Sequence, residues 1–172
     1  MDSFQFSDSW KVTDDVVRSF NKNGGILLRG VLDNEEVSRV LSYVQGSRNI
    51  QQHAYSCDDG AEGRSRLVEW NHPGDDITGM VARSEKIAGT FRDLLGGEVY
   101  HYHSKLMMKD AEVGGAHAWH QDYGYWYKNG ILTPDLGSVF IALDPCTRSN
   151  SCLQVLVGSH KMGRLDLSLI HI

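Results

Sequence analysis

A short aromatic-rich stretch of the chain holds two residue types that bind transition metals. This stretch, residues 119–126, contains His120 and Asp122 two positions apart. If the stretch is a strand, both side chains project from one face, and Gln121 between them points away in a structural role. A neutral imidazole and a carboxylate side by side supply two corners of the three-ligand site that leaves non-haem Fe(II) open to oxygen and a co-substrate. We therefore predict that His120 and Asp122 are metal ligands and form the catalytic centre.

Length and composition favour one domain. The chain has 172 residues, of which 41% are hydrophobic, enough for a single sizeable core. Its formal net charge of -5 and the absence of a Lys/Arg run argue against a nucleic-acid or anionic-membrane partner. No window is apolar for long enough to span a bilayer, and the start lacks the pattern of a secretory leader. We expect a soluble, cytoplasmic protein whose three cysteines are reduced and structurally incidental.

The elements that must position the metal ligands follow from capping and periodicity. Helices are predicted over residues 13–23, about 33–46 and 84–95, each ended by glycine, and strands over 26–28, 64–70 and 99–109. The polar segment 47–63 is predicted to be a mobile loop that acts as a lid over one end of the fold.

Strand alternation also offers a second metal site. It places His101, His103 and Lys105 on one face of the strand 99–109. With His120, these two histidines would give a three-His site of the kind found in some cupins. Histidines that make ordinary hydrogen bonds on a strand are commoner. Both interpretations stay open on the sequence alone.

Two motifs together resemble the phytanoyl-CoA dioxygenase family. One is Trp-His-Gln-Asp at 119–122, and the other is Leu-Gln-Val-x-x-Gly-Ser-His at 153–160, with a predicted strand at 138–144 between them. The resemblance covers roughly residues 12–166. It departs from the family pattern at Val157, where a proline is usual, and at Ser151, where a glycine is usual. Both departures affect turn geometry rather than chemistry.

The resemblance implies an α+β fold that is mainly β, with helices near the N-terminus. Its core would be a double-stranded β-helix, the jelly roll of cupins, incomplete at the C-terminal end. The implied activity is an Fe(II)- and 2-oxoglutarate-dependent dioxygenase. It would use molecular oxygen to hydroxylate a small or lipid-like organic substrate, convert 2-oxoglutarate to succinate, and take ascorbate as an optional further cofactor. The alternative from another class is a catalytically silent jelly-roll binding module.

Site residues follow from the resemblance position by position. Lys105 and Phe140 fall where family members line the 2-oxoglutarate pocket, and Arg64 matches a cation that contacts the keto acid. His160, in the Gly-Ser-His motif, matches a histidine that is not an iron ligand. An aromatic wall that could face the substrate follows the metal ligands: Tyr123, Tyr125, Trp126 and Tyr127.

The family's third ligand is expected further along the chain. Family members carry a distal histidine, and an arginine that pairs with 2-oxoglutarate, well beyond the His-x-Asp motif, whereas fifty residues follow Asp122. We interpret residues 167–172 as a non-native tail, so the predicted single domain is 1–166. His171 in that tail is the alternative third ligand. We expect this chain to be poorly stable, with weak or absent catalysis.

Overall fold

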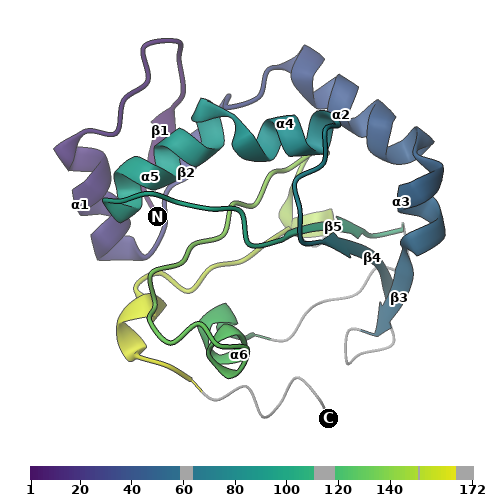
Figure 1. The fold of residues 1–172 in the computed structure, drawn as a ribbon. Coiled ribbons are helices and arrows are strands. Elements are labelled where there is room, and N and C mark those ends of the chain that lie inside the picture. The colour runs from purple at the N-terminus through teal and green to yellow at the C-terminus, as the bar shows by residue number, and fades with distance from the viewer. Residues whose placement is uncertain (59–63, 111–118, 151, 166–172) are drawn as a thin grey trace.

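The fold combines helices with two small sheets. The computed structural model describes residues 1–58, 64–110, 119–150 and 152–165 (Figure 1). The predicted α+β class is confirmed. Helices take a larger share than the predicted, mainly β, fold allows, and the described residues form no closed barrel. The predicted tail, with His171, lies outside the described residues.

The N-terminal unit pairs two short strands around a helix. Strand β1 (Ser3–Gln5) lies parallel to β2 (Leu27–Arg29), and α1 (Asp14–Asn23) crosses between them. Helix α1 ends at Gly24, whose φ of 78° is left-handed and whose N–H donates to the Phe20 carbonyl at 2.8 Å. The predicted helix and strand are both confirmed here.

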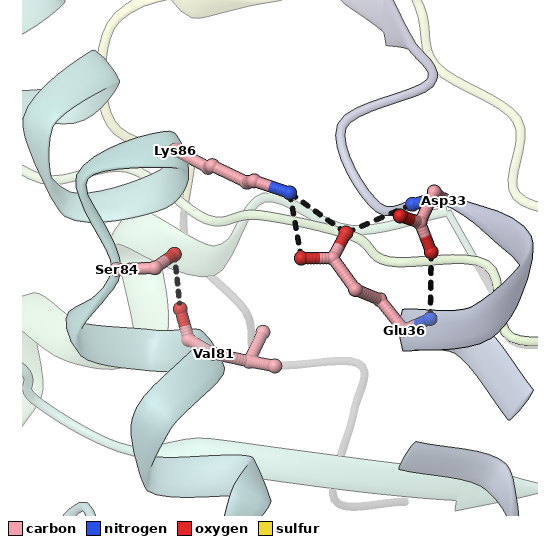
Figure 2. Close-up of polar contacts among 5 residues, drawn as sticks. All are labelled: Asp33, Glu36, Val81, Ser84 and Lys86. Carbon is pink, nitrogen blue, oxygen red and sulfur yellow. Dashed lines mark hydrogen bonds and ion pairs between the residues drawn. The ribbon is translucent and has the colours of Figure 1, made fainter. Parts of the chain in front are cut away.

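Helix α2 (Asn34–Gly46) begins with a capping box, as the acidic start predicted. The Glu36 N–H donates to Asp33 at 2.8 Å, and the Asp33 N–H donates to the Glu36 carboxylate at 2.9 Å. The same carboxylate accepts from Lys86 Nζ, with both oxygens at 2.7 Å (Figure 2). Glu36 therefore caps the start of α2 and also ties this helix to the helical segment that carries Lys86.

The segment predicted as a mobile polar loop is in large part regular structure. It contains α3 (Arg48–His53), where Ser47 accepts from the Ile50 N–H at 3.3 Å, and β3 (Tyr55–Asp58). The lid prediction is therefore wrong for residues 47–58, because the Ser47 cap and the pairing of β3 with the next strand satisfy this backbone. Residues 59–63, the rest of that loop, lie outside the described residues.

A three-stranded antiparallel sheet forms the centre of the fold. Its order is β3, β4 (Arg64–Trp70), β5 (Ser104–Met108), and β4 confirms the predicted strand. One face carries Val68 opposite Leu106, and it packs against Val40 and Val44 of α2 and against α4 (Ile77–Arg83). Figure 1 shows α2 and α4 on one side of the sheet and α6 (Asp122–Lys128) on the other. The sheet thus has a face covered by α2 and α4 and a second face, called the open face because neither of these helices covers it. The open face carries Glu69 and Lys105 and also the buried Leu67.

The helix predicted at 84–95 is the second half of a longer helical segment. Helix α4 precedes a π-helical turn, η1 (Glu85–Gly89), and α5 (Thr90–Leu95), which ends at Gly96 as predicted. Asp76 caps α4 by accepting from the Thr78 and Gly79 N–H groups at 2.9 and 3.1 Å. Gly79 must be glycine because an added Cβ would meet the Gly74 carbonyl oxygen at 1.8 Å.

The C-terminal half has less sheet than the sequence predicts. Only 104–108 of the predicted strand 99–109 is a strand, and the described parts of 138–144 and 153–158 form none. The two short 3-10 turns here are η2 (Arg148–Asn150) and η3 (Ser159–Met162). These segments have apolar β-forming residues but no neighbouring described strand to complete a ladder, so Leu153, Leu156 and Val157 are exposed.

Two predictions about the chain as a whole can be compared with the described residues. No described helix has both the length and the apolar character needed to cross a bilayer. Cys146 and Cys152 are free thiols, as predicted.

The double role of Glu36 gives a stability prediction. We expect Glu36→Ala to lower the free energy of unfolding by about 1 kcal/mol. The substitution removes the half of the capping box that the Glu36 side chain supplies, and it removes the ion pair with Lys86. Glu36→Gln keeps a side chain that can complete the capping box, so it should cost less, up to about 0.5 kcal/mol for a pair this exposed. Urea unfolding measures both values. Equal losses in the two variants would contradict a capping role.

Candidate metal centre

His120 and Asp122 are adjacent in space, but not for the predicted reason. His120 lies in extended backbone, Gln121 (φ -120°, ψ 119°) precedes the helix, and Asp122 is the first residue of α6. The strand predicted at 119–126 is therefore wrong. The extended residue followed by the first helical turn still brings His120 Nε2 to 3.1 Å from Asp122 Oδ1. A carboxylate in the first turn of a helix is favoured by the helix dipole, which helps to explain why the helix begins there.

The surroundings of Asp122 favour its charged form. The hydrogen bond from His120 is the main cause that lowers the pKa of Asp122, and the charges of His120 and Lys105 lower it further, against the opposing effect of burial. Ser138 Oγ also donates to Asp122 Oδ2 at 3.5 Å. Asp122 is therefore an ionised oxygen donor beside an imidazole nitrogen.

This donor set fits two positions around Fe(II). An imidazole nitrogen and a carboxylate oxygen are the ligand types of the two-His-one-carboxylate iron site, and here they converge. A third ligand is missing from what the structure describes: its residues contain no group of three His, Cys, Asp or Glu side chains arranged to hold a metal ion. His120 and Asp122 thus present two of the donor types that such a site uses, and the described residues add no third.

An aromatic cluster holds α6 against the residues that lead into β5. The centroid of the Trp126 ring lies 4.7 Å from that of His103 and 5.0 Å from that of Tyr102. The ring of Tyr125 also contacts Trp126, with 4.8 Å between the two centroids. Tyr123 and Tyr127 form a separate edge-to-face pair at 6.1 Å. The predicted aromatic residues therefore lie together, but they stand on helix α6 and not on a strand. Trp126 packs against other rings instead of facing solvent.

The three-His interpretation receives no support from these positions. His101 Nε2 lies 2.8 Å from Ser104 Oγ, and the His103 ring packs on Trp126. Burial is the main cause that lowers the pKa of His103, and the charge of Lys105 adds to it. Neither histidine joins His120 in a described metal cluster. Both make the ordinary packing or hydrogen-bonding contacts that were the alternative.

Lys105 lies on the open face of the sheet beside Glu69, a partner that the sequence alone did not indicate. Its Nζ is 3.1 Å from Glu69 Oε1, directly across the β4–β5 ladder, and Tyr55 donates from its hydroxyl to Glu69 Oε2 at 3.2 Å. The charge of Lys105 lowers the pKa of both Asp122 and His103, so this lysine is electrostatically part of the site. Glu69 could have been found from the sequence only with the strand register known.

The other predicted site residues are Phe140 and Arg64, and His160 is the histidine predicted to lie outside the metal site. Phe140 is 58% exposed on a segment that forms no strand, so the predicted strand position is wrong. Arg64 is the first residue of β4, and its side chain lies outside the described part of the structure. His160 Nε2 lies 2.9 Å from the Asn21 carbonyl oxygen of α1, a contact between two distant parts of the chain.

Comparison with known proteins gives one family model and several curated relatives. The family model described as phytanoyl-CoA dioxygenase (PhyH) matches residues 20–168. The chain is 30% identical to L-proline trans-4-hydroxylase of Streptomyces griseoviridis, over 86% of this chain and 55% of the relative. It is 26% identical to ectoine dioxygenase of Bordetella parapertussis, over 91% of this chain and 52% of the relative. The chain thus spans about half the length of the curated relatives it matches. No solved structure matches it.

The partly buried position of His103 predicts that the fold loses stability at low pH. Unfolded, this histidine titrates at its ordinary pKa of 6.5, and folding lowers that value. Above about pH 6.5 the ring is neutral in both the folded and the unfolded state. Below that pH the unfolded state binds the proton first, so the free energy of unfolding decreases as the pH is lowered. The charges of Lys105, Glu69 and Asp122 and the neighbouring His101 all act on the same ring.

We expect His103→Phe to keep the contact with Trp126 and to reduce this pH dependence. The measurement is the free energy of unfolding at about pH 7.5 and about pH 5.5, with tryptophan fluorescence as the signal. His72→Phe, at an exposed histidine, is the matched control and should change the pH dependence little. An unaltered dependence in His103→Phe would show that other groups cause the loss.

Proposed function

Because the chain belongs to the phytanoyl-CoA dioxygenase family, we propose that it carries part of the active site of an Fe(II)- and 2-oxoglutarate-dependent dioxygenase. The reaction would consume oxygen, 2-oxoglutarate and a substrate C–H bond, and yield succinate, carbon dioxide and the hydroxylated substrate. The observation that carries this proposal is the convergence of His120 Nε2 and Asp122 Oδ1 at 3.1 Å in a chain of this family.

His120 and Asp122 would hold the iron. When bound, the iron and its keto acid supply the oxidising power that breaks an unactivated C–H bond. The chain's own contribution begins with charge: Asp122 remains ionised because its surroundings lower its pKa, so no proton must leave before it can bind a cation. Packing of Trp126 against His103 and Tyr102 then fixes the helix on which Asp122 stands.

Lys105 is our candidate for the cation that receives a carboxylate of 2-oxoglutarate. Its position on the open face of the sheet and its electrostatic coupling to Asp122 support this role. A dicarboxylate would have to compete with Glu69 for the lysine. Arg64 and Phe140 remain proposed contacts of the co-substrate on the strength of the family resemblance alone.

We also propose that the open face of the β3–β4–β5 sheet faces the interior of a jelly roll. Two observations support this: the helices α2 and α4 cover the opposite face, and α6, which begins at Asp122, lies on the other side of the sheet (Figure 1). A jelly roll needs a second sheet across that interior. The segments 138–142 and 153–157, with the exposed Val139 and Phe140 in the first, have the apolar composition to contribute to it.

For the substrate, we propose a small amino-acid-like molecule. The relatives named above are a hydroxylase of L-proline and a dioxygenase of ectoine. Aromatic side chains beside the metal pair offer rigid apolar contact for a compact ring, and Glu69 and Lys105 offer charges of both signs.

Anaerobic titration tests the proposed iron chemistry. The complete gene product, given Fe(II) and 2-oxoglutarate without oxygen, should develop a weak visible charge-transfer band. His120→Ala and Asp122→Ala should each abolish the band, because each removes one ligand. His72→Ala should retain it, because His72 is an exposed histidine outside the site. Absence of the band from the unmutated protein would contradict the proposed function.

A second assay addresses the substrate class. With oxygen admitted, L-proline and ectoine are offered separately, and succinate and oxygenated product are quantified together. We expect one of these or a close analogue to raise succinate formation at least about tenfold over the reaction without substrate. Stimulation by a long-chain acyl substrate alone would instead favour a lipid-like substrate.

A further inference from the structure

The side chain of Gln121, between the two proposed metal ligands, binds a distant part of the backbone. Its Nε2 donates to the Gly163 carbonyl at 2.8 Å, and its Oε1 accepts from the Leu165 N–H at 2.9 Å. A primary amide has one acceptor and donors in a fixed plane, so it can pair with two backbone groups as a neighbouring strand would. Gln121 therefore makes a two-bond clip across 42 to 44 residues of sequence.

A third contact holds the same segment at the other end of α6. Arg164, between the two clipped residues, places its guanidinium 4.1 Å from the centroid of the Tyr127 ring. Gly163 has a φ of 75°, which only glycine adopts readily, and this turns the backbone out of the preceding 3-10 helix η3. Residues 163–165 thus run along α6 and contact both its start and its last turn.

The clipped segment is in turn anchored to the N-terminal unit. The Gly158 N–H donates to the Asn23 carbonyl at 2.8 Å, and His160 contacts the Asn21 carbonyl. The Gly-Ser-His motif is therefore fixed on α1, and the chain that leaves it ends on Gln121. The motif at 153–160 is thus held by α1, and residues 163–165, which follow it, contact Gln121 of the motif at 119–122.

We propose that Gln121 is a positioning residue for the His120–Asp122 pair. Its neighbours on both sides are the proposed ligands, so fixing its side chain at two points fixes the peptide planes that aim His120 and Asp122 at each other. Loss of the clip should let the extended residue before α6 rotate and separate His120 Nε2 from Asp122 Oδ1. The proposal rests on the proposed function for its purpose, but its geometry can be tested without metal.

The first measurement uses the metal-free 172-residue chain and three variants. Gln121→Ala removes both bonds, and Gln121→Glu keeps only the acceptor for Leu165. Gln154→Ala is the matched control because Gln154 is an exposed glutamine in the other motif. In Gln121→Ala, exchange of the Leu165 amide hydrogen should accelerate about fivefold or more, in line with one lost hydrogen bond. Gln121→Glu should accelerate it less, and the control should leave it unchanged.

The second measurement separates positioning from simple attachment. Nuclear Overhauser contacts between the His120 ring and the Asp122 side chain should weaken in Gln121→Ala and persist in Gln154→Ala, while the midpoint of thermal unfolding stays within about 3 °C. If the Leu165 amide exchanges faster and the His120–Asp122 contacts are unchanged, Gln121 only attaches the segment, and the proposal is wrong. Unchanged exchange would overturn it as well.

Metal binding by the complete gene product links the inference to the iron site. Co(II), followed by its visible absorption, should bind about tenfold more weakly to Gln121→Ala than to the unmutated protein, the scale typical of supporting residues around metal ligands. Equal affinity of these two proteins for Co(II) would overturn the positioning role. Failure of the unmutated protein to bind Co(II) would count against the proposed iron site, whereas the metal-free measurements would still decide the geometry.

Discussion

Burial of one face of the β3–β4–β5 sheet under α2 and α4 is the interaction on which the other features depend. Val68 of the sheet packs with Val40, Val44 and Ile50, and this cluster is the main core of the described residues. Because side chains alternate along a strand, this burial obliges Glu69 and Lys105 to occupy the opposite face. Hydrophobic packing on one side of the sheet thus determines which charges are available on the other. Helix α6, which begins at Asp122, lies on that same side and is held by aromatic contacts.

Opposite charges are paired on the open side of the sheet. Asp122 is matched by His120 and influenced by Lys105, and Lys105 is matched by Glu69. All four side chains are partly exposed, so solvent weakens each attraction, and none of the pairs stabilises the fold by much. Under the proposed function, these weak pairs would give way to a bound cation at Asp122 and a bound carboxylate at Lys105.

Local signals in the sequence predicted much of the N-terminal half. The Asp33–Glu36 capping box and the glycine stop at Gly24 act within a few residues, so pattern alone could place α1 and α2. The ion pair between Glu69 and Lys105 could not be foreseen, because it depends on the register between two strands far apart in the chain. The pair His120 and Asp122 was identified by residue type, but the element that carries Asp122 was predicted wrongly. Its aromatic residues suit a strand, whereas contacts of Trp126 with His103 and Tyr102 favour the helix.

The contacts between the Gly-Ser-His motif and α1 also bear on the order in which the molecule assembles. The β1–α1–β2 unit closes a loop of only about two dozen residues, so its ends meet early at little entropic cost. His160 and Asn21 are 139 positions apart, so their contact can form only after residue 160 has been synthesised. During synthesis, the β1–α1–β2 unit is therefore complete before the segment that packs on it. Residues 163–165 follow that segment in the chain, so their contacts with Gln121 form later than the β1–β2 pairing.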